Sequence, residues 1–528
     1  MKIPKIKIDY KIVFICGVCG VVLLIVGLYL GFSFLPKLVD KKLLETKILK
    51  ENTDQWKIFM KVPFSLNFKV YLFTIVNHEE VLKGAKPVVK ETGPYVYKLN
   101  RWKDDVIWNY VSDEISYYDY ELYDFDQEAS GDLTENDLVT ILNTPYVSFL
   151  LNAESNEATA GFLPMIDEAL EFIFAENNGP FLINVTVRDY LFDGIRFCKN
   201  GCVDDGFVAK MVCDKIKERL NVIDEMRLVG NDIVYSTFYH RNNTHQDYIT
   251  VNSGRKNNQE IGAMTHLNNK SFVKAWLNNK YQCNKVVGAT SVFPINLSSK
   301  TKFQSFSPDI CRSIKFEFAK MEMVGLIKGY TYFASKSSFN NSKNVLENRC
   351  YCTNKTQNLD GNFGCLYDGV TDITTCQGDP VLVSFPHLLH ADLRYVRSVE
   401  GLDPNSSKHE MFVTLEPVSG TPLKLAKKIQ FNMILRPIDG ITRLQNVVHS
   451  LIPLFWIEES TTLPEKYQQV IVNTLYRSLF IINVIKYSIL AVAVAIIASC
   501  CLLFFILNRT VYRTINLYLI RGFIFSDK

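Results

Sequence analysis

Two long uncharged apolar segments lie near opposite ends of this 528-residue chain and constrain its fold more than any other feature. The first runs from Ile12 to Leu35 and the second from Tyr487 to Leu507. At a rise of about 1.5 Å per residue, either helix is long enough to cross a hydrocarbon core about 30 Å thick. If both cross, both termini lie on one side, and the residues between them form a domain that faces a single compartment.

The alternatives for these two segments are weaker. A cleaved signal peptide has an apolar core of about 7–15 residues, and the sequence GFSFLP at 31–36 is a poor cleavage site. A buried core helix is the alternative for the second segment, but Arg509 and Arg513 follow it directly. We predict an N-terminal cytosolic segment 1–11, spans at 12–35 and 487–507, an intervening domain at 36–486 and a cytosolic tail at 508–528.

The orientation follows from sequons, because lysines flank the first segment on both sides and the positive-inside rule does not orient it. The middle carries seven Asn-x-Ser/Thr sequons, which together support a luminal or extracellular location. These predicted glycosylation sites are Asn184, Asn242, Asn269, Asn296, Asn340, Asn354 and Asn405. A further sequon at Asn508 adjoins the predicted cytosolic side and should carry no glycan.

Cysteines point to the same compartment. Nine of the 13 cysteines lie between the apolar segments, and six of these cluster within 283–376. Such a cluster predicts a disulfide framework formed in an oxidising compartment. A metal site is the alternative, but the CYC sequence at 350–352 lacks the two-residue spacer of a zinc knuckle. An odd total leaves at least one thiol unpaired within the chain, and the partners of Cys198, Cys202 and Cys213 stay open.

The middle of the chain predicts an α+β domain with a large antiparallel sheet or barrel. Helical spacing predicts a stalk at 40–60, a helical block at 135–176, and helices at 205–220 and 467–486. Runs of β-branched and aromatic residues predict strands at 68–76, 93–99, 106–111, 231–240, 313–319, 329–335, 380–389, 409–417 and 428–437.

No catalytic motif stands out, and we expect neither enzyme activity nor a cofactor. The chain has no GxSxG, GxGxxG, P-loop or HExxH sequence. His387 and His390 have a spacing that could hold a metal, but structural histidines are the simpler interpretation without acidic neighbours in sequence. The net charge of +3 gives no support for nucleic-acid binding. The remaining classes of function are binding of a ligand and conduction of a ligand.

Several strings resemble the class B scavenger receptor family nearly from end to end. That family includes the fatty acid translocase, the lysosomal integral membrane protein, and the insect sensory neuron membrane proteins and croquemort. The strings are ETGPYVYK at 91–98, TVRDYLFDG at 186–194, FSPDICRSIKFEF at 306–318, CYC at 350–352, VSFPHLLHAD at 383–392, and a long ungapped segment at 400–433.

The resemblance implies an antiparallel β-barrel core topped by a helical bundle, here at 135–178, with an apolar tunnel that runs towards the membrane. It implies disulfides that pair Cys283 with Cys350, Cys311 with Cys376, and Cys352 with Cys365. It also makes Cys500 and Cys501 candidates for palmitoylation, although small residues packed between helices explain them as well.

The implied function is a cell-surface, scavenger-type receptor that binds a hydrophobic lipid and facilitates its transfer to the plasma membrane. The candidate ligands are of the fatty acid, sterol, carotenoid or pheromone type, with or without a protein carrier. The alternative is a receptor for a protein partner in endocytosis, phagocytosis or lysosomal sorting, with lipid conduction secondary and a lysosomal or endosomal location. A homo-oligomer is compatible with both.

The chain departs from the family pattern at the predicted apex. Some scavenging members carry lysines there that attract anionic ligands, whereas no lysine lies between Ala153 and Cys198. The acidic residues in this block predict repulsion of anionic lipoproteins, although acids that merely solvate helix faces would give the same pattern. The candidate ligand contacts at the apex are Glu168, Glu171, Phe172 and Glu176.

Overall fold

A computed structural model describes residues 10–174, 181–257, 260–276, 282–341, 345–353 and 355–524, with side chains described up to residue 513. The chain divides into two compact units. The smaller contains residues 1–46, 325–327 and 464–528, and the larger contains 47–324 and 328–463.

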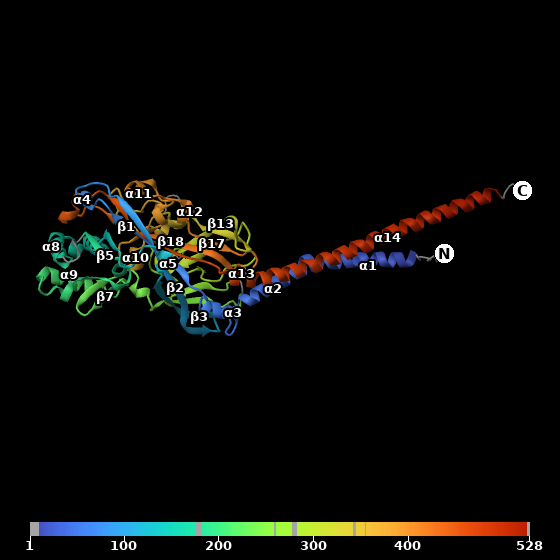
Figure 1. Cartoon of the computed structure of the whole chain (residues 1–528), viewed down its shortest axis with the longest axis horizontal. Coiled ribbons are helices and arrows are strands. Elements are labelled where there is room, and N and C mark those ends of the chain that lie inside the picture. Colours follow the sequence, from blue (N-terminus) through green and yellow to red (C-terminus); the bar gives the residue numbers. More distant parts are fainter. Residues whose placement is uncertain are drawn as a thin grey trace. The chain divides into compact units, whose positions relative to one another are not determined.

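The smaller unit is formed mainly by two long apolar helices, α1 and α14, which run side by side (Figure 1). The first helix consists of α1 (Tyr10–Tyr29), a π-helical turn η1 (Leu30–Phe34) and α2 (Leu35–Lys47). The second consists of α13 (Glu465–Ile471), the π-helical η11 (Val472–Tyr476) and α14 (Arg477–Ile524). Both are long and apolar enough to cross a membrane by length and composition.

Glycines bring α1 close to α14. A β-carbon at Gly20 would lie 2.9 Å from the Ile497 side chain, and one at Gly27 would lie 3.1 Å from Ile489. Small residues at such positions let two helix backbones approach closely, which is the usual means of helix association in lipid. This explains why glycines interrupt an otherwise bulky apolar segment.

The larger unit is built around one antiparallel sheet. Its strand order is β11-β10-β9-β3-β2-β1-β19-β18-β17-β14-β13-β12, with β16 pairing to β18 and β15 to β16. The strands are β1 (Leu66–Ile75), β2 (Val89–Asn109), β3 (Glu114–Phe125), β9 (His245–Asn252), β10 (Ala263–Leu267), β11 (Gly288–Ala289), β12 (Lys302–Ser307), β13 (Arg312–Val324), β14 (Ile327–Ala334), β15 (Thr371–Asp372), β16 (Leu382–Ser384), β17 (Phe412–Leu415), β18 (Pro422–Leu435) and β19 (Ser450–Thr462).

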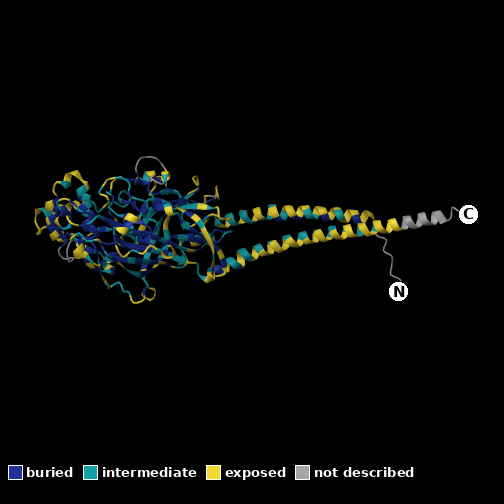
Figure 2. Ribbon diagram, turned by 90° about the horizontal axis from the view of Figure 1, so that it is seen from above, coloured by how far each residue is buried: buried dark blue, intermediate teal, exposed yellow. Residues whose placement is uncertain are grey.

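The sheet is nearly closed into a barrel. Ser305 Oγ on β12 donates a hydrogen bond of 2.8 Å to the carbonyl oxygen of Ala289 on β11, so the first and last strands of the order meet. In the middle of the order, β19 is buried at every position from Ser450 to Trp456, the pattern of a strand covered on both faces. Buried side chains concentrate inside this unit, whereas the terminal helices of the other unit are largely exposed (Figure 2).

Helices gather at one end of the larger unit, where Figure 1 shows α8 and α9 beside β5 and β7. α6 (Thr144–Ser155), α7 (Glu157–Ala160) and α8 (Leu163–Ile173) follow one another, and α9 is Phe207–Lys217. Two small sheets accompany them: β4 (Leu138–Leu142) with β5 (Leu182–Thr186), and β8 (Asp232–Tyr235) between β6 (Ile195–Phe197) and β7 (Met226–Val229). Shorter helices elsewhere are α3 (Asp54–Met60), α4 (His78–Val81), α5 (Gln127–Ser130), α10 (Thr374–Gln377), α11 (Leu393–Arg397) and α12 (Ser406–His409).

The structure confirms the α+β class and the barrel-like sheet but corrects three local predictions. Residues 138–142 form strand β4 rather than helix, because this β-branched run pairs with β5. The strand predicted at 380–389 is limited to Leu382–Ser384, since a 3₁₀ turn starts at Pro386. The predicted stalk helix stops at Lys47 and restarts at α3, where Thr53 accepts a hydrogen bond from the Trp56 amide (3.2 Å).

The packing of α1 on α14 makes a cross-linking prediction. A β-carbon at Gly17 would lie 3.7 Å from that of Cys500, within the range of about 3.5–4.5 Å found in disulfides. We expect Gly17→Cys, with Cys16, Cys19 and Cys501 replaced by serine, to form a disulfide with Cys500 on oxidation in membranes. A protease site placed at 48–53 gives the readout, because the cross-linked N-terminal fragment stays attached until reduction. Val21→Cys, on an exposed face of α1, should release its fragment.

Candidate functional site

A cavity of about 730 Å³ lies within the larger unit. Residues from β3, β9, β18 and β19 line it, so it lies between strands that are well separated in the sheet order. Thr144, the first residue of α6, also lines it and connects the cavity to the helical end. The volume is in the range that holds small organic ligands.

One wall of this cavity is aromatic. Phe431 on β18 stacks on Phe455 of β19 with ring centroids 4.8 Å apart, and Phe238 meets Phe455 edge to face at 5.9 Å. Leu454 lines the cavity beside them. Apolar contact of this kind favours a hydrocarbon ligand by about 25 cal/mol per Å² of surface removed from water.

Another part of the wall carries carboxyl groups. Burial and, to a lesser extent, the neighbouring Asp379 carboxylate raise the pKa of Glu225 to about 8. Burial also raises the pKa of Asp379, which accepts a hydrogen bond of 2.7 Å from Ser148 Oγ on α6. The nearby His240 imidazole has its pKa lowered to about 4 by burial. At neutral pH, Glu225 and His240 therefore favour their uncharged forms. The carboxyl residues on the wall are Asp224, Glu225, Asp247, Asp309 and Asp379.

A buried ionic network adjoins the cavity. Arg241 lines the cavity and donates to Glu121 of β3 (3.0 Å) and to Asp309 (3.0 Å). Arg101 of β2 donates to the same Glu121 (3.1 Å) and to Glu459 of β19 (2.8 Å). Burial disfavours the charged form of Glu121, but Arg241 and Arg101 outweigh it and lower the pKa of Glu121 to about 2.

Lys427 of β18 completes this network by pairing with Asp309. Burial opposes ionisation of Asp309 as well, yet Lys427 and Arg241 hold its pKa well below the usual range. Three cations thus face three carboxylates, so the network is balanced. It joins four strands of the barrel, β2, β3, β18 and β19, to the loops that carry Arg241 and Asp309.

The predicted apex contacts lie elsewhere. Glu168, Glu171 and Phe172 are exposed on α8 and do not line the cavity, and Glu176 lies outside the described residues. Glu171 pairs with Arg443 (2.5 Å), which lowers the pKa of the Glu171 carboxyl.

Two other acids of the apex also bond to the segment that carries Arg443. Glu154 pairs with Arg436 (2.9 Å), and Asp167 accepts a hydrogen bond from the Thr442 amide (2.8 Å). Segment 436–443 thus supplies the cations that the apex sequence lacks. The acidic field expected from the local sequence is therefore partly neutralised.

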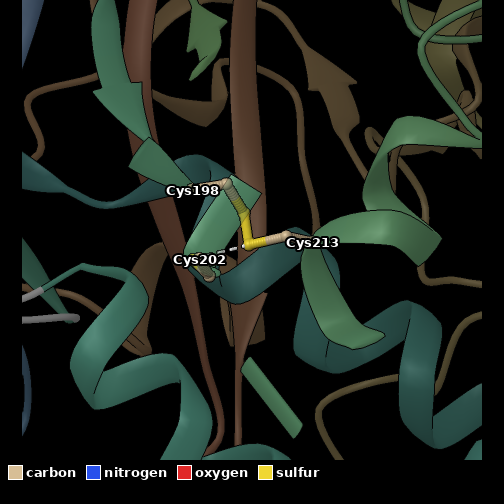
Figure 3. A group of neighbouring side chains, drawn as sticks. All are labelled: Cys198, Cys202 and Cys213. Atoms are coloured by element: carbon tan, nitrogen blue, oxygen red, sulfur yellow. Dashed lines mark hydrogen bonds between the residues drawn. A yellow bond between two sulfur atoms is a disulfide. The ribbon is translucent and has the colours of Figure 1, made fainter. Parts of the chain in front are cut away.

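Four disulfides join cysteines within the described residues. Three join Cys283 to Cys350, Cys311 to Cys376, and Cys352 to Cys365, the pairs that the resemblance implies. The fourth joins Cys198 to Cys213. Cys202 is a free, buried thiol whose Sγ lies 2.9 Å from Cys213 Sγ (Figure 3). Burial raises the pKa of the Cys202 thiol to about 12. The three sulfur atoms are close enough for a metal site, but two of them are bound in a disulfide and cannot act as thiolate ligands.

His387 and His390 find acidic partners that are distant in sequence. His387 Nε2 lies 2.6 Å from Glu91, which also accepts from Trp456 Nε1 (2.7 Å), and His390 Nε2 lies 2.8 Å from Glu410. The two imidazoles therefore contact different carboxylates and do not converge on one site. This arrangement supports structural roles for both.

The predicted modification sites differ in their exposure. Asn184, Asn269 and Asn296 are exposed. Asn242, Asn340 and Asn405 are half-buried, and Asn354 lies outside the described residues. Cys501 is exposed, whereas Cys500 packs against Gly17. Cys501 is therefore the more accessible of the two predicted palmitoylation sites.

A nearly closed barrel in a chain with a membrane-length helix near each end is the arrangement that the resemblance to the class B scavenger receptors implies. The sequence matches the CD36 family over residues 18–504, and the chain belongs to this family of receptors. It is 29% identical to sensory neuron membrane protein 2 of Drosophila melanogaster, covering 94% of this chain and 97% of the relative. It is 32% identical to sensory neuron membrane protein 2 of Heliothis virescens, with 91% of each covered. Identity to sensory neuron membrane protein 1 of Antheraea polyphemus is 30%, over 87% of this chain and 85% of the relative.

The ionic network predicts a large loss of stability on removal of one partner. Glu121→Gln leaves Arg101 and Arg241 without their shared charge, and breaking a buried pair costs about 3–5 kcal/mol. Because the folded-state pKa of Glu121 is lowered to about 2, its contribution is present above about pH 4.5 and is lost as pH falls towards 2. Melting temperatures of variant and wild type should therefore converge in acid. Glu317→Gln, in the exposed pair with Lys302, should change little.

The contribution of Glu225 to stability should depend on pH in the opposite direction to that of Glu121. Its folded-state pKa of about 8 lies above that of the unfolded chain, so its contribution falls as pH rises from about 4.5 to 8, by up to about 1.4 kcal/mol per pH unit. We expect Glu225→Gln to melt at the wild-type temperature near pH 4.5 and at a higher temperature near pH 8. A gap between the two proteins that is constant over this range would contradict the assignment.

Proposed function

We propose that this protein is a cell-surface receptor that binds a hydrophobic ligand in the cavity and facilitates its transfer to the membrane. The observation that carries the proposal is the aromatic wall of a 730 Å³ cavity, within the barrel of a chain that has two membrane-length helices. The ligand class is a fatty acid, sterol, carotenoid or pheromone-type molecule.

The physical reason for such a cavity is the insolubility of the ligand. Moving an alkyl chain from an apolar environment into water costs about 0.8 kcal/mol per CH₂. A protein wall of Phe238, Phe431 and Phe455 replaces water along part of the ligand's path. Transfer then needs no chemical step, which agrees with a receptor rather than an enzyme.

The proposed topology places residues 36–486 outside the cytosol, 12–35 and 487–507 in the bilayer, and both termini in the cytosol. The four disulfides and the exposed sequons at Asn184, Asn269 and Asn296 support this orientation. The relatives are named as membrane proteins of sensory neurons, which supports the plasma membrane as the location.

A second candidate function is recognition of a protein partner at the helical end. Phe162, Met165 and Phe172, in and next to α8, are large apolar side chains with about half or more of their surface exposed. Such exposure is typical of protein contact surfaces, and Glu168 lies on the same helix. The partner could be a carrier protein that delivers the hydrophobic ligand or a protein unrelated to the ligand. The exposed apolar surface is compatible with both.

Filling the cavity tests the main proposal. Ala275 is a buried residue of the cavity wall, and Ala275→Trp should reduce uptake of a fluorescent long-chain fatty acid and of fluorescent cholesterol to background. Surface expression should persist, measured by labelling of intact cells. Ala129→Trp, exposed on α5, is the matched control and should take up both probes normally. Normal uptake by Ala275→Trp at normal expression would exclude this cavity as the route and favour the second function.

A further inference from the structure

The turn that joins β2 to β3 exposes apolar side chains where polar ones are usual. This hairpin tip, residues 107–112, has the sequence IWNYVS. Exposure is 60% for Ile107, 61% for Tyr110 and 85% for Val111. Asn109 Oδ1 accepts hydrogen bonds from the amides of Val111 and Ser112, both at 3.1 Å. The turn is thereby held in a shape that presents these side chains outward.

Aromatic residues from α3 support the hairpin tip. Trp56 packs against Trp108 with ring centroids 5.1 Å apart, and Trp108 stacks with Tyr110 at 5.7 Å. Ile58 on the same helix is also about half exposed. Behind the turn, the buried Asp113 accepts a hydrogen bond of 2.7 Å from the Lys256 amide. The exposed apolar surface therefore belongs to a braced structure rather than to an unsupported loop.

Cations flank this surface. The Arg255 guanidinium lies 4.7 Å from the Trp108 ring and 5.2 Å from the Tyr110 ring. Lys256 Nζ donates 2.7 Å to the carbonyl oxygen of Val111. Tryptophan and tyrosine next to arginine and lysine is the composition found where proteins meet lipid headgroups, because the rings bridge the apolar and polar layers and the cations attract phosphate.

Two exposed acids of β2 lie behind the tip, and Asp54 on α3 is paired with Lys57 (3.2 Å). Asp104 and Asp105 are exposed but lie beyond Ile107 along β2, on the side away from the turn. They would remain in the aqueous layer when the tip enters the interface.

The position of α3 in the chain also supports contact with a lipid bilayer. The supporting helix α3 follows α2 after only the six residues 48–53, and α2 continues the first apolar helix. Trp56 and Ile58 of the patch are therefore close in sequence to a helix of membrane-spanning length.

We propose that the hairpin tip, with Trp56 and Arg255, is a membrane-interface anchor that inserts Ile107, Tyr110 and Val111 into a phospholipid bilayer. The tip thus adds a third attachment to the two spans. It acts on the barrel itself, because the hairpin is formed by two of its central strands, β2 and β3. The proposal does not depend on the ligand or on the cavity.

Photolabelling of the full-length protein tests this anchor. The protein is reconstituted in phosphatidylcholine vesicles that contain a phosphatidylcholine with a diazirine in its acyl chain, and lipid adducts are mapped by mass spectrometry after irradiation. We expect adducts on the peptide that contains residues 107–111, in addition to those on 487–507, which serve as the internal positive control. Leu228 and Val229, an exposed apolar pair at the β7–β8 turn, should remain unlabelled.

Two double variants distinguish insertion of the hairpin tip from nonspecific labelling of exposed apolar residues. Tyr110→Ser combined with Val111→Asp should abolish adducts on Ile107, Trp108 and Trp56 and leave those on 487–507 unchanged. Leu228→Ser combined with Val229→Asp should change nothing. Unchanged melting temperatures show that both variants fold. Labelling of 487–507 without labelling of 107–111 above the Leu228–Val229 level would overturn the proposal, as would persistence of the Trp56 and Trp108 adducts in the first variant.

Discussion

The paired charges inside the barrel are the interaction on which the rest of this structure depends. Arg101, Glu121, Arg241, Asp309 and Glu459 come from segments that are up to about 360 residues apart, and none of them can be buried singly without a large desolvation penalty. The network therefore fixes β2 and β3 relative to β18 and β19, next to the cavity. Arg241 belongs to both, since it bonds to Glu121 and Asp309 and also lines the cavity.

The cavity combines two environments that usually exclude one another. Its aromatic side is built from β18, β19 and Phe238, whereas Glu225, Asp379 and His240 line another part of it. The pKa of Glu225 is raised to about 8 and that of His240 lowered to about 4, chiefly by burial, so both side chains favour their neutral forms at neutral pH. Neutral polar groups of this kind can accept and donate hydrogen bonds without placing a net charge beside the aromatic wall.

Sequence patterns predicted the elements whose partners are local or whose burial alternates. The strand expected at 68–76 is β1, and the helix expected at 205–220 is α9. Sequence patterns gave wrong predictions where contact with a segment distant in sequence determines the secondary structure or the charge balance. Residues 138–142 become a strand only because β5 pairs with them. The acidic apex looked uncompensated because Arg436 and Arg443 lie almost 300 residues beyond it.

The same limit applies to the site. Glu225 and Asp379 are separated by more than 150 residues, and no spacing rule connects them. His387 and His390 lacked acidic neighbours in sequence, yet Glu91 and Glu410 reach them in space. The family resemblance supplied the barrel and three cysteine pairs, but not this chain's own arrangement of charge.

The thiol of Cys202 touches the sulfur of a disulfide that closes the loop between β6 and α9. Attack by its thiolate on Cys213 would form a Cys202–Cys213 bond and release Cys198, with no oxidant needed. Burial raises the pKa of Cys202 to about 12, so the thiolate that this exchange requires is scarce at neutral pH. A treatment that opens this loop in alkaline solution removes this protection and allows the disulfide to exchange. Peptide maps of the cysteines report the folded protein only when free thiols are blocked under acidic conditions before digestion.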